Sequence, residues 1–393
     1  MQNDSLAKSP NPFNPGSPVD PADFVGRGQE LENFRSKLRQ TATGSLASMA
    51  VAGGYGIGKT SFLHRCRSIA EEQNALAIYF SLSELDKISK DDLARILISR
   101  IRDKVREEVI LQRISDHVLD VLSRIKLSAG GGAIEIGLDA ERDSHPNLQS
   151  ALKAAWAAVK DSKKAIVFLI DEARALERNR AELLLYLRAV LEQLQVDRIP
   201  VMIVPAGKLS ISGPPSTGFS PLVRTFPPAM LENFTNQEST TFIVKKLNQV
   251  KMRTGENALT KVHDVTEGHP YVLAAYLAAA YDKVAPNEAE LTTAHFEAAD
   301  VEFVNRALRP FFARFYDQTG PSSRQILTKM AENFGEASLS ELTNALNKSS
   351  NELSPYLARL VQDGAIVRVD RGKYRLFHHL LGVYINQMNK DSH

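Results

Sequence analysis

The stretch AGGYGIGKTS, which runs from Ala52 to Ser61, decides the fold of this chain. Four of its residues have the spacing G-x-x-x-x-G-K-[ST]: Gly53, Gly58, Lys59 and Thr60. The apolar segment MAVA precedes this loop, and SFLHRCRSIA follows it, so the loop joins a strand to a helix. Backbone N–H groups at the start of such a helix attract anions. The sequence therefore predicts an anion-binding loop at a strand-to-helix junction.

This loop resembles the phosphate-binding loop of P-loop nucleoside triphosphatases. Glycine adopts backbone angles that other residues resist, so successive N–H groups can point at a triphosphate. The resemblance implies that Lys59 reaches the β- and γ-phosphates and that the Thr60 hydroxyl ligates Mg²⁺. The residues expected to contact the nucleotide here are Gly53, Gly54, Tyr55, Gly56, Ile57, Gly58, Lys59, Thr60 and Ser61. A glycine-rich turn that binds nothing is the alternative.

A second motif lies in KKAIVFLIDEARAL. Ala165–Ile170 is an unbroken apolar run, which is typical of a central strand buried on both faces. It ends in Asp171 and Glu172, and together with an upstream phosphate loop this pair matches the Walker B pattern. Asp171 would then help to hold Mg²⁺, and Glu172 would activate the attacking water. Alternatively, the two acids mark the start of a helix, where negative charge is favoured.

Composition limits the class of protein. The chain has 393 residues, of which 43% are hydrophobic and 24% charged, so we expect a soluble protein of two or three domains. The net charge of +2 requires any nucleic-acid surface to be local. The single cysteine, Cys66, excludes an internal disulfide and suits a cytoplasmic location. No signal peptide is expected, and the apolar run Tyr271–Tyr281 is too short to span a membrane.

Residues 1–22 are rich in Pro, Asn, Ser and Asp, and we expect an extended leader. A helix is expected next, with three apolar residues on one face: Leu31, Phe34 and Leu38. Val25, Gly26 and Arg27 precede it. In AAA+ ATPases of the origin-recognition initiator type and in STAND signalling ATPases, a similar Val-Gly-Arg stretch packs on the adenine. Those families usually have Glu where this chain has Gly28, and a plain helix start is the alternative.

The segments between and after the two motifs continue an alternation of strands and helices. We expect a strand at Ala75–Leu82, a helix at Lys90–Val109 and a strand at Ile199–Val204. The segment Ile125–Leu138 predicts a hairpin, which either touches partners or covers the sheet edge. Pro205–Gly207 is expected to form a turn, with Lys208 and Ser210 just after it at the place of a sensor.

Arg224, in SPLVRTF, stands where related ATPases often carry a basic residue that faces the nucleotide of a neighbouring subunit. The resemblance implies that it stabilises transition-state charge in trans. A solvated side chain is the alternative.

The pattern becomes helical from Thr235, where TNQEST predicts a helix start. Gly268, His269 and Pro270 then precede an alanine-rich helix. This turn resembles the GxP signature of STAND and initiator lids, in which the proline begins a helix that faces the nucleotide. His269 either senses phosphate or sets the backbone of the turn. No arginine follows at the place of a second sensor, which favours the STAND side of the resemblance.

The segment Gly320–His393 predicts three helices and then a β-hairpin around Asp370-Arg371-Gly372. This is the winged-helix order, with the third helix as the reading helix. The hairpin carries four basic residues that suit phosphate contacts: Arg368, Arg371, Lys373 and Arg375. Winged helices of STAND proteins often act as internal clamps instead, so DNA contact and protein contact both remain open.

Taken together, the chain resembles AAA+/STAND ATPases similar to origin-recognition initiators. The predicted fold is α/β: a P-loop αβα core with a parallel sheet over 23–230, a helical lid over 231–318 and a winged helix over 319–393. The resemblance implies ATP and Mg²⁺ as cofactors, Lys59, Glu172 and Arg224 as catalytic residues, and Thr60 and Asp171 as metal ligands. The expected partners are double-stranded DNA and a second copy or another protein. The alternative is a signalling or defence ATPase whose winged helix makes protein contacts only.

Overall fold

The structure is a computed structural model that describes residues 8–83, 88–112, 147–207, 221–304 and 308–391. It divides into two compact units, which are described separately. The sheet unit comprises Pro18–Gly53 and Gly58–Glu232, and the helical unit comprises Met1–Ser17, Gly54–Ile57 and Asn233–His393. The hairpin predicted at 125–138 and the sensor candidates at 208 and 210 lie outside the described residues. No described helix has the length and apolar character needed to cross a membrane.

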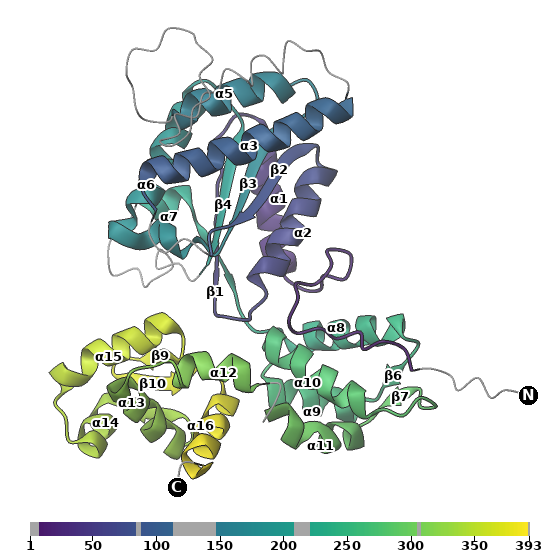
Figure 1. Cartoon of the computed structure of the whole chain (residues 1–393), viewed down its shortest axis with the longest axis vertical. Coiled ribbons are helices and arrows are strands. Elements are labelled where there is room, and N and C mark those ends of the chain that lie inside the picture. Colours follow the sequence, from purple (N-terminus) through teal and green to yellow (C-terminus); the bar gives the residue numbers. More distant parts are fainter. Residues whose placement is uncertain (1–7, 84–87, 113–146, 208–220, 305–307, 392–393) are drawn as a thin grey trace, which may run out of the picture. The chain divides into compact units, whose positions relative to one another are not determined.

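Within its described residues, the sheet unit is built on a sheet of five strands in the order β2-β3-β4-β1-β5 (Figure 1). All neighbouring strands in this sheet pair in parallel. The strands are β1 (Ala50–Gly53), β2 (Ala75–Ser81), β3 (Ala165–Asp171), β4 (Val201–Gly207) and β5 (Pro228–Leu231). Every residue of β3 is buried, because helices cover both faces of a parallel sheet. The predicted α/β fold with a parallel sheet is confirmed.

Two groups of helices cover the sheet (Figure 1). On one face, α3 (Lys90–Gln112), α5 (Leu148–Val159) and α6 (Arg178–Val196) share an apolar core with alternate strand residues such as Ile78 and Phe168. On the other face lie α1 (Gly28–Ala42) and α2 (Lys59–Glu72). The short elements η1 (Ala173–Glu177) and α7 (Pro221–Thr225) follow β3 and precede β5. The predicted apolar face of α1 is confirmed, with buried Leu31, Phe34 and Leu38.

Strand β4 runs further than predicted, so the expected turn at Pro205–Gly207 was wrong. All seven residues of β4 are buried, and Ala206 and Gly207 pair with Val51 and Ala52 of β1. Proline is rare inside a central strand because it has no N–H to donate. Pro205 is nevertheless paired in register with Ile170 of β3. Pairing on both sides therefore carries the strand past the proline.

The helical unit begins with four helices and a short parallel strand pair. These elements are α8 (Asn236–Gln249), β6 (Arg253–Thr254), α9 (Glu256–Thr266), α10 (Pro270–Lys283), β7 (Glu290–Leu291) and α11 (Thr293–Glu302). The predicted helix start at Thr235 is confirmed, because Thr235 and Glu238 form a capping box. The described part of the predicted leader packs on this unit. Phe13 is 4% exposed and its ring lies against those of Phe242 and Tyr281.

The remainder of the helical unit contains further helices and an antiparallel sheet of order β8-β10-β9. Its elements are α12 (Arg309–Tyr316), α13 (Pro321–Glu332), β8 (Glu336–Ser338), α14 (Leu339–Leu346), α15 (Ser350–Asp363), β9 (Ile366–Asp370), β10 (Lys373–Leu376) and α16 (His379–Asp391). The three predicted helices and the hairpin between Asp370 and Lys373 are present. Helices α12 and α16 and strand β8 were not predicted, and α16 packs on α13 and α12.

Candidate nucleotide site

The phosphate-loop sequence begins at the end of β1 and ends at the start of α2. Gly58 caps α2 with φ of 94°, a left-handed backbone angle that favours glycine. Lys59 is the first residue of the helix, and its Nζ donates to the Gly53 carbonyl oxygen at 3.2 Å. The Ser61 hydroxyl oxygen accepts a hydrogen bond from the Val19 N–H at 3.0 Å. The lysine is therefore folded back toward the beginning of the loop.

Asp171 lies at the carboxyl end of β3 and is 3% exposed. Its Oδ2 accepts hydrogen bonds from the Thr60 hydroxyl at 2.7 Å and from the Tyr79 hydroxyl at 3.0 Å. Its Oδ1 accepts from the Glu172 N–H at 2.9 Å. The structure thus brings together Thr60 and Asp171, which are 111 positions apart in the chain. A hydroxyl and a carboxylate are hard oxygen ligands, so this pair fits Mg²⁺.

Sequence reasoning missed Tyr79. In the pairing of β2 with β3, Tyr79 lies opposite Leu169 and Ser81 lies opposite Asp171, so the Tyr79 phenol needs to extend only two positions along the sheet. The His64 ring, from α2, packs against the Tyr79 ring at a steep angle of 71°, with the centroids 4.6 Å apart. Burial and the neighbouring Asp171 raise the pKa of the Tyr79 phenol, which therefore stays protonated and donates. One feature of the sequence could have indicated Tyr79: its hydroxyl is a polar group within the otherwise apolar run ALAIYFSL.

Glu172 follows Asp171 with φ of 48°, a left-handed angle that is uncommon outside glycine. The two neighbouring acids have different surroundings: the Asp171 side chain is buried, whereas the Glu172 side chain is exposed. The 3₁₀-helix η1 begins directly after Glu172. The two acids therefore lie between the end of β3 and the start of a short helix.

The residues predicted to contact adenine precede α1. Gly26 and Arg27 have left-handed φ angles of 74° and 60°, and Val25 and Gly26 are partly buried. Arg27 is 5% exposed, and its carbonyl oxygen accepts from the Leu31 N–H in the first turn of α1. Arg27 is thus buried at the position immediately before α1.

Arg224 lies in the last turn of α7, and its side chain is exposed. Among the described residues, the donors to the Asp171 carboxylate are the Thr60 and Tyr79 hydroxyls and the Glu172 N–H.

The middle of the phosphate-loop sequence, Gly54–Ile57, belongs to the helical unit. The Tyr271 N–H donates to the Gly56 carbonyl oxygen at 3.2 Å, and His269 Nε2 donates to the Tyr55 carbonyl oxygen at 3.1 Å. The Tyr55 ring stacks on Phe311 with centroids 5.4 Å apart. Gly54 and Tyr55 are exposed, and Ile57 is buried. Two carbonyl groups of this segment are thus held by the residues that flank Pro270.

The predicted turn before α10 is confirmed, with Pro270 as the first residue of the helix. His269 Nδ1 accepts from the Val272 N–H, so this histidine caps the helix. Burial lowers the pKa of His269 to about 3, which keeps the ring neutral. A Cβ on Gly268 would lie 2.1 Å from the Phe234 carbonyl oxygen, so only glycine fits there. Of the two roles considered for His269, the contacts described are those of a residue that sets the backbone.

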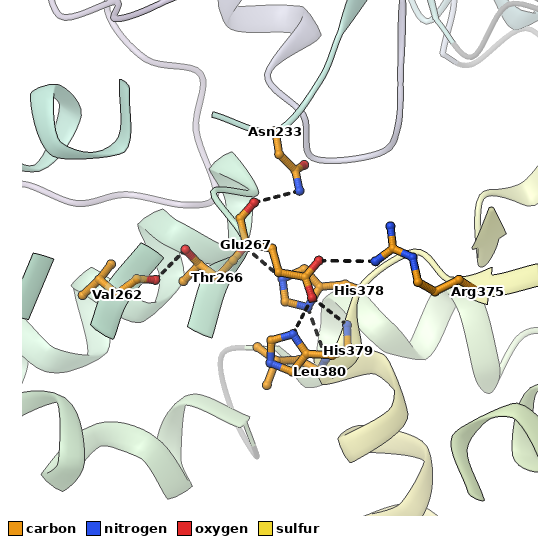
Figure 2. Close-up of polar contacts among 8 residues, drawn as sticks. All are labelled: Asn233, Val262, Thr266, Glu267, Arg375, His378, His379 and Leu380. Atoms are coloured by element: carbon orange, nitrogen blue, oxygen red, sulfur yellow. Dashed lines mark hydrogen bonds and ion pairs between the residues drawn. The ribbon is translucent and has the colours of Figure 1, made fainter. Parts of the chain in front are cut away.

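A second polar cluster surrounds Glu267, the residue before this turn (Figure 2). Its Oε1 accepts from His379 Nδ1 at 2.6 Å, and its Oε2 lies 3.9 Å from the Arg375 guanidinium. The hydrogen bond from His379 lowers the pKa of Glu267 to about 2. The carboxylate therefore keeps its negative charge opposite two basic residues.

His378, in the same cluster, is fully buried (Figure 2). Its Nε2 donates to the Thr266 carbonyl oxygen at 2.9 Å, and its Nδ1 accepts from the Leu380 N–H at 3.1 Å. Ligand atoms of Glu267, His378 and His379 lie within 4.8 Å of one another, a spacing that could suit a metal ion. Because both ring nitrogens of His378 are hydrogen-bonded to the backbone, this histidine has no lone pair left for a metal.

The parallel sheet and the hydrogen-bonded pair of Thr60 and Asp171 are features of the P-loop NTPase fold. Residues 23–204 match the AAA ATPase domain family. This part of the chain is therefore an AAA ATPase domain. Residues 309–385 match a family described as a domain of unknown function.

Solved structures support the fold over nearly the whole chain. A Walker-type ATPase of Pyrococcus abyssi has a TM-score of 0.63 at 15% identity, with 94% of this chain and 99% of that chain covered. The ORC2 protein of Aeropyrum pernix has a TM-score of 0.61 at 14% identity, with 98% of each chain covered. A Methanocaldococcus jannaschii protein described as an uncharacterised HTH-type transcriptional regulator is 22% identical over 386 residues, covering 93% of this chain and 89% of that protein.

Proposed function

We propose that this protein is a Mg²⁺-dependent ATP-hydrolysing switch that associates with DNA and assembles in a nucleotide-dependent way. The observation that carries the proposal is the hydrogen bond between Thr60 and Asp171, because it places a hydroxyl and a carboxylate directly behind Lys59 on the phosphate loop. A lone glycine-rich turn would need no buried carboxylate at this point.

In the proposed mechanism each residue acts on the triphosphate or on the attacking water. Lys59 exchanges its bond to the Gly53 carbonyl oxygen for the β- and γ-phosphates. Thr60 and Asp171 would hold Mg²⁺, which neutralises charge that develops on the phosphates. Glu172, exposed beside the buried Asp171, orients the attacking water and accepts its proton.

Further residues are proposed to bind the rest of the nucleotide. Val25, Gly26 and Arg27 would contact adenine, and Pro270 would present the start of α10 to the nucleotide. Arg224, which is exposed on α7, is proposed to act on the site of a second copy. An arginine that acts in trans has to be exposed in its own chain.

The Glu172→Gln variant tests the hydrolysis step. We expect it to bind ATP as the wild type does, measured by calorimetry, and to lose phosphate release by about 100-fold or more, as is usual when a general base is removed. Glu71→Gln, an exposed acid on α2, is the matched control and should hydrolyse ATP normally. Undiminished phosphate release by Glu172→Gln would remove Glu172 from this role.

The proposed nucleotide-dependent assembly is tested by the size of the protein in solution with ATP and with ADP. A ligand shifts an equilibrium only if it binds two states unequally, so a switch needs ATP and ADP to favour different assemblies. Gel filtration with ATP in the Glu172→Gln variant and with ADP in the wild type should give different elution volumes. Identical volumes would contradict a nucleotide-driven assembly.

We further propose that residues 319–393 form a winged helix that binds double-stranded DNA. Helices α13, α14 and α15 are followed by the β9–β10 hairpin, which β8 joins through β10. Arg368, Arg371 and Lys373 are exposed on this hairpin, where they can contact phosphates. The similarity to a protein described as an HTH-type regulator supports the same proposal.

Reversal of the charges at Arg371 and Lys373 to Glu tests the contact with DNA. We expect weaker binding of a DNA duplex and a shallower dependence of binding on salt, because fewer counterions are released. Reversal of Lys251 and Arg253, which are exposed before and in β6, is the control. Unchanged DNA binding after the hairpin reversal would refute this contact.

A signalling or defence ATPase that uses this domain for protein contacts is the second candidate. The observation in its favour is that three large apolar side chains of this domain are exposed: Val369 is 61%, Val367 44% and Tyr356 39% exposed. In addition, Arg359 lies 3.7 Å from Asp363 and Arg375 lies 3.9 Å from Glu267, which reduces the basic charge free for DNA. Absence of DNA binding in the wild type, with nucleotide-dependent assembly intact, would favour this candidate.

A further inference from the structure

The hydrogen bond from Tyr79 to Asp171 has no counterpart in the predicted site. Tyr79 lies on β2, whereas the predicted residues lie on the phosphate loop and at the end of β3. Its hydroxyl donates to Oδ2, the same carboxylate oxygen that accepts from Thr60. The candidate Mg²⁺ ligand is thus held from two elements of the sheet unit at once.

Both the backbone and the ring of Tyr79 are held by neighbouring elements of the sheet unit. Tyr79 lies within the parallel pairing of β2 and β3, which fixes its backbone opposite Leu169. The His64 ring packs against the Tyr79 ring, and α2 carries both His64 and Thr60. A tyrosine held in this way needs little reorganisation to keep its hydroxyl on Asp171.

We propose that Tyr79 is a positioning residue, which fixes the Asp171 carboxylate in the orientation that binds the divalent metal of the ATPase site. This inference rests on the proposed function. The Thr60 hydroxyl has one proton and two lone pairs, so it can keep its proton on Asp171 while a lone pair faces the metal. Tyr79 serves as the second donor and prevents rotation of the carboxylate away from this arrangement.

The role proposed for Tyr79 is to position a metal ligand and not to take part in the hydrolysis step. Tyr79 touches Asp171 and, through its ring, His64, and it is assigned no contact with the nucleotide. Loss of its hydroxyl should therefore weaken metal binding and leave the step after saturation with metal nearly intact. Support of this kind from a neighbour of a metal ligand typically changes metal affinity by about 10- to 100-fold.

The Tyr79→Phe variant tests the proposal, because it removes the hydroxyl and keeps the ring on His64. Mn²⁺ is titrated into the full chain in the presence of ADP, and free Mn²⁺ is measured from its electron paramagnetic resonance signal. We expect about tenfold weaker Mn²⁺ binding, with ADP affinity in the absence of metal unchanged. Tyr186→Phe is the matched control, since Tyr186 is a half-buried tyrosine on α6 of the same unit.

A second readout uses phosphate release. The Mg²⁺ concentration for half-maximal rate should rise by about the same tenfold factor, whereas the rate at saturating Mg²⁺ should stay near that of the wild type. Wild-type metal affinity in Tyr79→Phe, or an equal loss in Tyr186→Phe, would overturn the positioning role. A wild-type protein that binds neither Mn²⁺-ADP nor Mg²⁺-ATP would instead overturn the proposed function, so the two failures are distinguishable.

Discussion

Two buried or half-buried carboxylates, Asp171 in the sheet unit and Glu267 in the helical unit, are held in opposite ways. The hydrogen bonds of Asp171 come from two hydroxyls and one backbone N–H, all of which are neutral donors. Glu267 faces the His379 ring and the Arg375 guanidinium. Neutral donors fix a carboxylate without cancelling its charge, whereas basic partners neutralise it. The first arrangement still attracts a cation, and the second joins α9 to β10 and α16.

The comparison also shows that closeness of ligand atoms does not make a metal site. Glu267, His378 and His379 have the more suggestive side chains, and their ligand atoms lie within 4.8 Å of one another. Nevertheless, the lone pair of His378 is occupied by the Leu380 N–H. At Asp171, the oxygens of a hydroxyl and a carboxylate remain able to accept a metal. Whether a cluster can bind a metal therefore depends on which of its ligand atoms still have a free lone pair.

The largest expected effect comes from Asp171→Asn. The amide keeps the shape of the carboxylate but loses its charge, so we expect ATP hydrolysis at saturating Mg²⁺ to fall by about 100-fold or more. Glu267→Gln makes the same chemical change in the other cluster and should alter the rate less than about twofold, because its charge is used within the fold. Phosphate-release assays measure both. A similar loss in both variants would erase the distinction between the clusters.

The next largest effect is on the stability of the helical unit. His378→Ala removes a fully buried ring and leaves the Thr266 carbonyl and the Leu380 N–H without a partner, so α16 should open more easily by about 2–4 kcal/mol. His379→Ala, whose side chain is 45% exposed, should cost about 1 kcal/mol or less. Native-state hydrogen exchange in α16 reports the free energy of opening. Equal losses would mean that burial of His378 contributes little.

A lower pH should also reduce the free energy of opening α16, by a smaller amount. Burial lowers the pKa of His378 to about 4 from an ordinary value of 6.5, so below pH 6.5 the opened state binds a proton that the folded state does not. The free energy of opening α16 should therefore fall by about 1.5 kcal/mol between pH 6.5 and pH 5. Glu267 stays charged in the folded state because its pKa is about 2, and it adds only about 0.2 kcal/mol in the same direction because its ordinary value of 4.5 lies below this window.

The His378→Ala variant is the control for this pH dependence and should lose most of the slope. His269, whose pKa burial lowers to about 3, contributes in the same direction only where its own segment also opens. A wild-type opening energy that does not change between pH 6.5 and pH 5 would contradict a neutral, buried His378.

The smallest expected effect is that of Zn²⁺ at the Glu267 cluster. A metal that binds the folded state raises the melting temperature by mass action. Because His378 is fully hydrogen-bonded, we expect no rise in melting temperature with micromolar Zn²⁺ and no difference between wild type and Glu267→Gln. Mg²⁺ with ADP should raise the melting temperature of both proteins. A Zn²⁺-dependent rise that Glu267→Gln abolishes would establish a metal site there.

The sequence predicted those parts of the site that depend on local pattern. The phosphate loop and the Asp171–Glu172 pair have fixed spacing and lie at the ends of apolar strands, so their elements could be placed without knowing the sheet order. Tyr79 could not be predicted in the same way, because its partner is 92 positions away and becomes a neighbour only through the register of β2 and β3.

Other features escaped prediction for related reasons. His378 meets Thr266 across 112 positions of chain, and its two bonds are to backbone atoms that no side-chain pattern reveals. Pro205 indicated a turn on local grounds, and pairing with two neighbouring strands overrode that preference. Strand β8 has only three residues, too few for an alternating pattern to be recognised.

The leader has a practical consequence for anyone who expresses this protein. Lys8 Nζ binds the Tyr281 and Val284 carbonyl oxygens at the carboxyl end of α10, and Asn11 binds the Ala278 carbonyl oxygen. A shortened protein that starts after Phe13 would expose parts of the Phe242 and Tyr281 rings to water and remove the Lys8 and Asn11 hydrogen bonds at the end of that helix. Aggregation is the expected result, so a shortened protein made for crystallisation should keep residues 8–17.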